Sequence, residues 1–139
     1  MRLVLDTNVW LDWLVFRDPS VAPIAAAVAA GRAEVLIDAA CEAELERALG
    51  YDLGRAVDVA ACLAECRGVA KRIESVPAER AVLPACRDPH DQKFLEAALA
   101  AGAAFLVTKD KELLELARRD SLPFRIVTPQ ALLAEERKR

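Results

Sequence analysis

Four acidic residues stand where an α/β fold would aim them at one point. Asp6 and Asp110 follow the apolar runs 3–5 and 105–107, and Glu44 and Asp91 lie in segments with helical periodicity. Two carboxylates about 4 Å apart repel by roughly 4 kcal/mol at an effective dielectric near 20, so a cluster of four needs a cation. Hard divalent ions prefer oxygen ligands, so we expect one or two Mg²⁺ or Mn²⁺ ions.

Helical periodicity places Asp91 next to the core. At about 100° per residue, it shares a face with Phe94, Leu95 and Ala98. An anion in the first turn of a helix is also stabilised by the helix dipole. We therefore expect Asp91 at the start of a core-facing stripe, where a solvated surface acid would not lie.

The same test separates three glutamates in the segment 39–49. Glu44 falls within an apolar stripe of that segment, whereas Glu42 and Glu46 fall on its polar side. An acid within a core stripe requires a partner or a metal ion. Glu44 is thus the predicted ligand of the three.

Each acid also has a structural explanation. Asp6 or Asp110 could cap the helix that follows it, and Asp91 could simply be a dipole acid. Glu44 could pair with Arg47 or Arg32. The remaining candidates are explained better as caps or solvated acids: Asp88 before Pro89, Asp38 and Asp12. The four principal acids together are harder to explain in this way than any one alone.

The elements around these acids predict an α/β fold. Apolar runs at 3–5, 35–37, 105–107 and 125–127 are typical of buried strands. Helices are expected at 9–16, 21–30, 38–50, 54–69, 88–101 and 111–119 and from 129 onward, with a loop at 73–84. Strands alternating with helices predict a three-layer α/β/α sandwich with a short, mainly parallel central sheet. We expect one domain over residues 1–139, with a charged tail at about 134–139. Ligands of such sheets bind beyond the carboxyl ends of the strands.

Composition excludes several classes of protein. The chain has no apolar run near the ~20 residues that span a bilayer and no signal-peptide pattern, so a cytoplasmic protein without a membrane partner is expected. Four cysteines without a CxxC pair, beside one histidine, argue against zinc. The net charge of −3 is mildly unfavourable for nucleic acid. Bound metal would offset it, and phosphates could then meet the nearby basic residues: Arg47, Arg87, Lys93, Lys109 and Lys111.

Four sequence blocks resemble the PIN domain family: LDTNVW at 5–10, ELERAL at 44–49, the long segment 87–114 and RIVTPQALL at 125–133. The family comprises metal-dependent ribonucleases, many of them toxins of bacterial toxin–antitoxin pairs. The resemblance assigns the acidic quartet to Asp6, Glu44, Asp91 and Asp110. It also assigns supporting roles to Asn8, which would orient the first aspartate, and to Thr108.

The chain departs from the family pattern at four places, one of them residues 39–41, where a serine or threonine often stands. Lys109 stands where the related branch usually has glycine, and His90 stands where an acid is frequent. Glu112 replaces a further aspartate, which bears on how a second metal ion would be held. None of these changes removes a member of the quartet.

The resemblance implies hydrolysis of RNA, with single-stranded RNA expected because the phosphate must enter a concave site. Metal ions would activate a water, and Thr7 and Asn8 would fix Asp6 from a second layer. The family also implies a cognate antitoxin and a homodimer. The alternative is a catalytically silent PIN-like module that binds RNA or protein. A dehalogenase-like phosphatase is disfavoured because it needs an acid where Asn8 stands, and a receiver domain because it needs paired acids and a suitable lysine.

Overall fold

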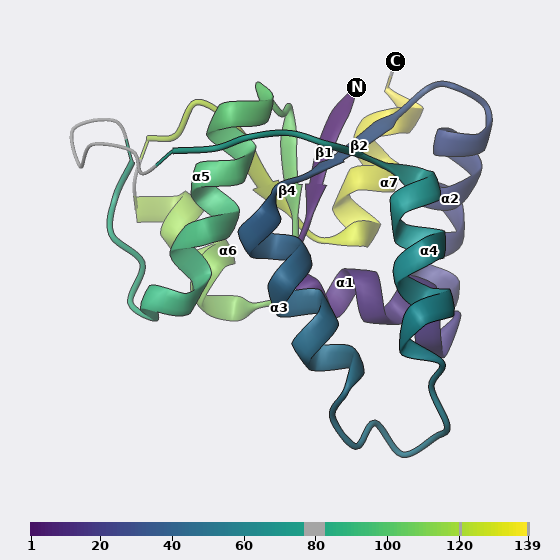
Figure 1. The fold of residues 1–139 in the computed structure, drawn as a ribbon. Helices are drawn as coiled ribbons and strands as arrows, with labels where there is room; N and C mark the ends of the chain where they lie inside the picture. The colour runs from purple at the N-terminus through teal and green to yellow at the C-terminus, as the bar shows by residue number, and fades with distance from the viewer. Residues whose placement is uncertain (77–82, 120, 139) are drawn as a thin grey trace.

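A five-stranded parallel sheet forms the centre of the protein (Figure 1), seen in a computed structural model that describes residues 1–76, 83–119 and 121–138. The strands are β1 (Arg2–Leu5), β2 (Glu34–Ile37), β3 (Ala70–Arg72), β4 (Phe105–Val107) and β5 (Arg125–Val127). Their order is β3-β2-β1-β4-β5, and each neighbouring pair is parallel. The first strand therefore lies in the middle of the sheet.

Helices cover the sheet on both faces. Successive residues of a strand point to opposite faces, and residues 3–5 of β1 and 35–37 of β2 are all buried. Helix α5 packs against β1, β2 and β4, whereas α7 packs against β4, β5 and α2. The predicted α/β sandwich is confirmed. No helix within the described residues is long and apolar enough to cross a membrane.

The α-helices largely follow the predicted segments. Their bounds are α1 (Thr7–Leu11), α2 (Ala22–Ala29), α3 (Ala39–Leu49), α4 (Val59–Val69), α5 (Gln92–Ala101), α6 (Lys111–Arg119) and α7 (Pro129–Arg137). A π-helical turn at Asp12–Phe16 extends α1, and 3-10 turns at Pro19–Val21 and Pro89–Asp91 precede α2 and α5. The predicted single helix over 9–16 is therefore two pieces of different winding.

Two boundary predictions were wrong, and a third lies partly outside the described residues. Strand β3 was missed because it is a three-residue edge strand with two exposed residues, which gives no apolar run. Helix α4 begins at Val59 and not near Gly54, since the Asp58 side chain accepts a hydrogen bond from the Ala61 N–H at 3.0 Å. The loop predicted at 73–84 falls partly on residues 77–82, outside the described residues.

The charged tail also continues the last helix, contrary to the prediction that helix α7 frays there. Two ion pairs hold that segment: Arg125 with Glu135 at 2.7 Å and Arg32 with Glu136 at 2.7 Å. Helix α7 therefore runs to Arg137, and only Arg139 of the predicted tail lies outside the described residues.

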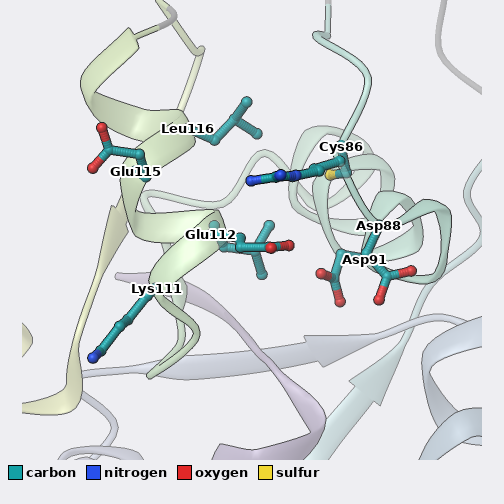
Figure 2. Close-up of a pocket in the computed structure, with 9 residues that line it drawn as sticks. Cys86, Asp88, Asp91, Lys111, Glu112, Glu115 and Leu116 are labelled. Carbon is teal, nitrogen blue, oxygen red and sulfur yellow. The ribbon is translucent and has the colours of Figure 1, made fainter.

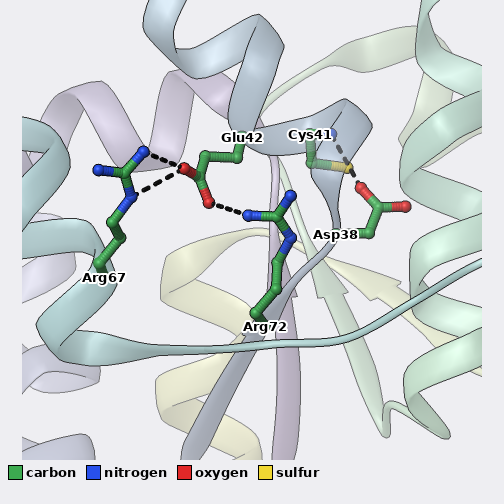
Figure 3. Close-up of polar contacts among 5 residues, drawn as sticks. All are labelled: Asp38, Cys41, Glu42, Arg67 and Arg72. Atoms are coloured by element: carbon green, nitrogen blue, oxygen red, sulfur yellow. Dashed lines mark hydrogen bonds and ion pairs between the residues drawn. The ribbon is translucent and has the colours of Figure 1, made fainter.

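Glu42 corrects the helical-phase prediction. It was placed on the polar side of α3, yet only 8% of it is exposed. One of its oxygens accepts hydrogen bonds from Arg67 Nε at 2.9 Å and Nη2 at 2.7 Å, and the other accepts from Arg72 Nη1 at 2.6 Å (Figure 3). These two arginines come from α4 and β3, so the pairs fasten the edge strand to α3.

Asp38 has a capping role at the start of the same helix. Its side chain accepts from the Cys41 N–H at 2.8 Å, as predicted for a helix N-cap (Figure 3). The hydroxyl of Ser75 donates to its other oxygen. These two hydrogen bonds account for an acidic residue at this position.

Candidate metal centre

The structure brings Asp6, Glu44, Asp91 and Asp110 to the wall of one cleft of about 520 Å³. The four come from the end of β1, from α3, from the turn before α5 and from the start of α6. The rest of the cleft mixes polar and apolar side chains: Thr7, Asn8, Leu11, Arg47, Ala48, Tyr51, Leu53 and His90. Residues more than a hundred positions apart in the chain therefore share one site.

The central strand fixes Asp6. Its N–H donates to the Val107 carbonyl at 2.9 Å, and its own carbonyl accepts from Val9 at 3.0 Å and Trp10 at 3.1 Å. The backbone thus starts α1, while the side chain makes no capping hydrogen bond to that helix. The carboxylate is only 5% exposed, so capping does not explain why an acid lies here.

Thr108 links two of the acids. Its hydroxyl donates to Asp6 Oδ2 at 2.7 Å and accepts from the Asp110 N–H at 2.9 Å. The residue is fully buried, which fixes the direction of that hydroxyl. Thr108 therefore sets both the orientation of the Asp6 carboxylate and the course of the backbone into Asp110.

Asp110 does two things at once. Its Oδ1 accepts from the backbone N–H groups of Glu112 at 2.8 Å and Leu113 at 3.3 Å, which is the capping role considered as its structural explanation. Side-chain oxygens of Asp91, Asp110 and Glu112 also lie within 4.8 Å of one another. Capping accounts for the position of Asp110 but not for this gathering of three carboxylates.

Glu44 is held by the chain's own groups. Its carboxylate accepts from the Thr7 hydroxyl and from Lys93 Nζ, both at 2.5 Å. Arg32, one of the arginines considered as its partner, instead pairs with Glu136. Lys93 thus supplies a positive charge at the wall of the cleft, and Thr7 acts on Glu44 through its hydroxyl.

The electrostatics of the cleft favour a bound cation. Burial raises the pKa of Asp6, and the negative charges of Asp110 and Glu44 raise it further. Hydrogen bonds from the Thr108 side chain and the Thr7 backbone lower it in part. Burial, followed by the charges of Asp110 and Asp6, raises the pKa of Asp91 to about 6. Both shifts mean that negative charge is costly here. An oxygen-only donor set of this kind suits Mg²⁺ or Mn²⁺.

Asn8, predicted to support Asp6, and Lys109, predicted to contact phosphate, have surroundings that differ from those predictions. Asn8 lines the cleft but is exposed, and within the described residues no hydrogen bond joins it to Asp6. Lys109 was expected near phosphate, yet its ammonium pairs with Asp12. Asp12, predicted to be solvated or capping, is buried at 9% exposure, because this pair compensates its charge.

The other predicted residues lie at or beside the site. Asp88 caps the turn before α5 by accepting from the His90 N–H at 2.9 Å, as expected. Glu112 stands where the family often has a further aspartate, and its carboxylate lies close to those of Asp91 and Asp110. Arg47 lines the cleft, and its side chain is exposed to an approaching ligand.

Tyr51 is a cleft residue that sequence reasoning missed. It is 66% exposed, which is unusual for an aromatic side chain, and it lines the same cleft as Arg47. Its only signal was its place directly after Gly50, where the predicted helix stops. A residue past a helix end has no periodic phase, so periodicity could not assign it.

The fold and the cleft together define an α/β protein with a cluster of carboxylates beyond the ends of β1 and β4. The sequence profile of the PIN domain matches residues 2–112. The chain belongs to the PIN domain family.

Solved structures agree with that assignment at the level of the fold. PAE2754 from Pyrobaculum aerophilum is 21% identical, with a TM-score of 0.63 over 100% of this chain and 91% of that one. VapBC2 from Rickettsia felis, solved bound to a DNA fragment from its promoter, is 15% identical, with a TM-score of 0.65 over 92% of this chain and 98% of that one. No curated protein matches the sequence significantly.

Proposed function

We propose that the protein is a Mg²⁺- or Mn²⁺-dependent endoribonuclease. The observation that carries the proposal is the meeting of Asp6, Glu44, Asp91 and Asp110 in one cleft. Membership of the PIN domain family supports it, because the family implied by the sequence motifs is one of metal-dependent ribonucleases.

The carboxylates divide into direct and supporting roles. Asp6, Asp91 and Asp110 would hold the ion, with Glu112 extending the set and Glu44 contributing from α3. A divalent ion held there lowers the pKa of a water and offsets charge on the phosphate oxygens. Thr108 keeps the Asp6 carboxylate in one orientation by its hydrogen bond at 2.7 Å.

The basic side chains at the cleft are suited to the substrate backbone. Arg47 and Lys93 place positive charge beside the acids, so that a phosphodiester can approach a wall that is otherwise negative. The cleft is open and concave, which suits a flexible single strand better than a rigid duplex. No side chain is required as a nucleophile.

We further propose that the protein is the toxin of a toxin–antitoxin pair and acts in the cytoplasm as a homodimer. Support comes from the family motifs and from the shared fold of VapBC2 of Rickettsia felis. A cognate antitoxin would cover the acidic cleft. Co-expression with the product of any short adjacent gene, followed by co-purification and mass measurement, tests both the pairing and the dimer.

The nuclease proposal is tested by cleavage of labelled single-stranded RNA with Mg²⁺, with Mn²⁺ and with chelator. We expect metal-dependent cleavage by the wild type and a loss in Asp6→Asn and Asp91→Asn larger than the roughly 10–100-fold typical of supporting residues. Glu46→Gln, an exposed glutamate on α3, is the matched control and should retain activity.

Two outcomes would contradict the proposal. Equal cleavage by the wild type and both aspartate variants would show that the activity does not come from this cleft. Tight RNA binding without metal, together with no cleavage when metal is present, would instead favour a silent binding module.

A further inference from the structure

A second pocket adjoins the carboxylate cleft. It has a volume of about 320 Å³ and lies between the segment that leads into α5 and helix α6. Asp91 lines both cavities, so they meet at a member of the acidic quartet. In Figure 2, Cys86, Asp88 and Asp91 form one wall, and Glu112 reaches towards them from α6.

The pocket has an apolar floor with a polar rim. Leu113 and Leu116 are almost fully buried, and burial raises the pKa of the Cys86 thiol to about 11, so that this thiol is neutral. The volume is at the lower end of the range for small-molecule pockets, about 300–1,000 Å³, which suits a single ring system. A flat group with polar edges matches this lining.

The charges of the lining select among ligands. Four acids and two bases border the pocket, namely Asp88, Asp91, Glu112, Glu115, Arg87 and Lys111. This excess of acid disfavours a phosphate or a carboxylate inside it. Asp91 and Glu112 are candidate metal ligands, so Asp88 and Glu115 are the carboxylates left to accept hydrogen bonds from the amino groups of adenine, cytosine and guanine, and Arg87 can stack on a base face. Uracil has no amino group.

We infer that this pocket binds the nucleobase adjacent to the cleaved phosphate and prefers amino-bearing bases to uracil. The inference rests on the proposed ribonuclease function, since the base enters attached to a phosphate in the neighbouring cleft. Asp91 is the residue at which the two subsites meet. The pocket thereby gives the enzyme a means of choosing its cleavage site.

Free nucleosides test the pocket without phosphate, metal or cleavage. Adenosine, cytidine and guanosine should shift backbone amide signals of residues 86–91 and 111–116 in NMR titrations, with dissociation constants in the millimolar range. Uridine should bind about fivefold more weakly, as expected for one lost hydrogen bond. Cys86→Phe should fill the pocket and abolish the shifts.

Arg87→Ala provides a second variant at an exposed position, should Cys86→Phe fail to fold. It should weaken nucleoside binding about five- to a hundredfold by removing a stacking partner. Arg137→Ala, an exposed arginine at the end of α7, is the matched control and should leave binding unchanged.

These outcomes test the base-binding pocket independently of the proposed ribonuclease activity. Absence of nucleoside shifts in the wild type, or equal shifts in Cys86→Phe and the wild type, overturns the base subsite even if RNA is cleaved. Binding of argininamide at the same amides without nucleoside binding would assign the pocket to a cationic peptide side chain. Nucleoside binding by a protein that cleaves no RNA would keep the pocket and refute the nuclease.

Discussion

The carboxyl group of Asp91 should make metal binding depend on pH. Its pKa is raised to about 6 by burial and by the charges of Asp110 and Asp6, and a metal ligand must be deprotonated. About nine in ten of these groups are ionised at pH 7 and about one in ten at pH 5, so affinity should fall about tenfold between them. Burial also raises the pKa of Asp6, which acts in the same direction.

The same shift has the opposite effect on the metal-free fold. A carboxyl whose folded pKa is raised binds more protons in the folded state, so stability falls as pH rises from about 4 to about 6. The full shift corresponds to at most about 3 kcal/mol. Asp91 is partly open to solvent, which reduces the expected loss to about 1 kcal/mol. Saturating Mg²⁺ should reverse the trend, because the ion binds the ionised form.

Calorimetric titration with Mn²⁺ between pH 5 and pH 8 measures the affinity, and urea unfolding with and without Mg²⁺ measures the stability. Asp91→Asn should bind the ion more weakly and with a shallower pH dependence, whereas Glu46→Gln should follow the wild type. A wild-type affinity that is flat between pH 5 and pH 7, or a slope unchanged in Asp91→Asn, would refute the reasoning.

Three further substitutions test other parts of the structure. Glu42→Ala removes the hydrogen-bond partner of Arg67 on α4 and of Arg72 on β3. The free energy of unfolding, measured with urea, should fall by about 2 kcal/mol, and the double variant with Arg67→Ala should lose less than the sum of the two single variants. Glu46→Ala should lose under about 0.5 kcal/mol. Thr108→Val, of the same shape, should lower Mn²⁺ affinity about 10–100-fold while circular dichroism is unchanged, and wild-type affinity would contradict its orienting role. Tyr51→Ala should weaken single-stranded RNA binding about five- to a hundredfold, with Tyr51→Phe close to wild type; equal loss in both would exclude stacking.

Local signals in the sequence predicted most of the fold. The runs 3–5, 35–37, 105–107 and 125–127 are strands because consecutive apolar residues can be buried on both faces of a parallel sheet. Asp38 and Thr128 could be recognised in the sequence as N-caps, and the side chain of each accepts a hydrogen bond from the backbone N–H three residues later. Strand β3 lacked such a signal, because an exposed edge strand is defined by its partner β2 and not by its own composition.

The surroundings of the acids were harder to predict than their positions. Helical phase shows which way a side chain points but not which residue meets it. Glu42 is buried because Arg67 and Arg72 arrive from 25 and 30 positions away, and Glu44 meets Lys93 from 49 positions away. Such pairings depend on the packing of whole elements, which no short window of sequence contains.

The central place of β1 has a consequence for protein synthesis. The strand is made before the other four described strands, yet one of its two neighbours, β4, is made about a hundred residues later. The hydroxyl that orients Asp6 belongs to a residue 102 positions further on. Because the chain is made from its N-terminus at about 5–20 residues per second, the carboxylate cleft stays unassembled for several seconds after β1 has been made. The four carboxylates of the cleft therefore cannot meet until Asp110 has been made.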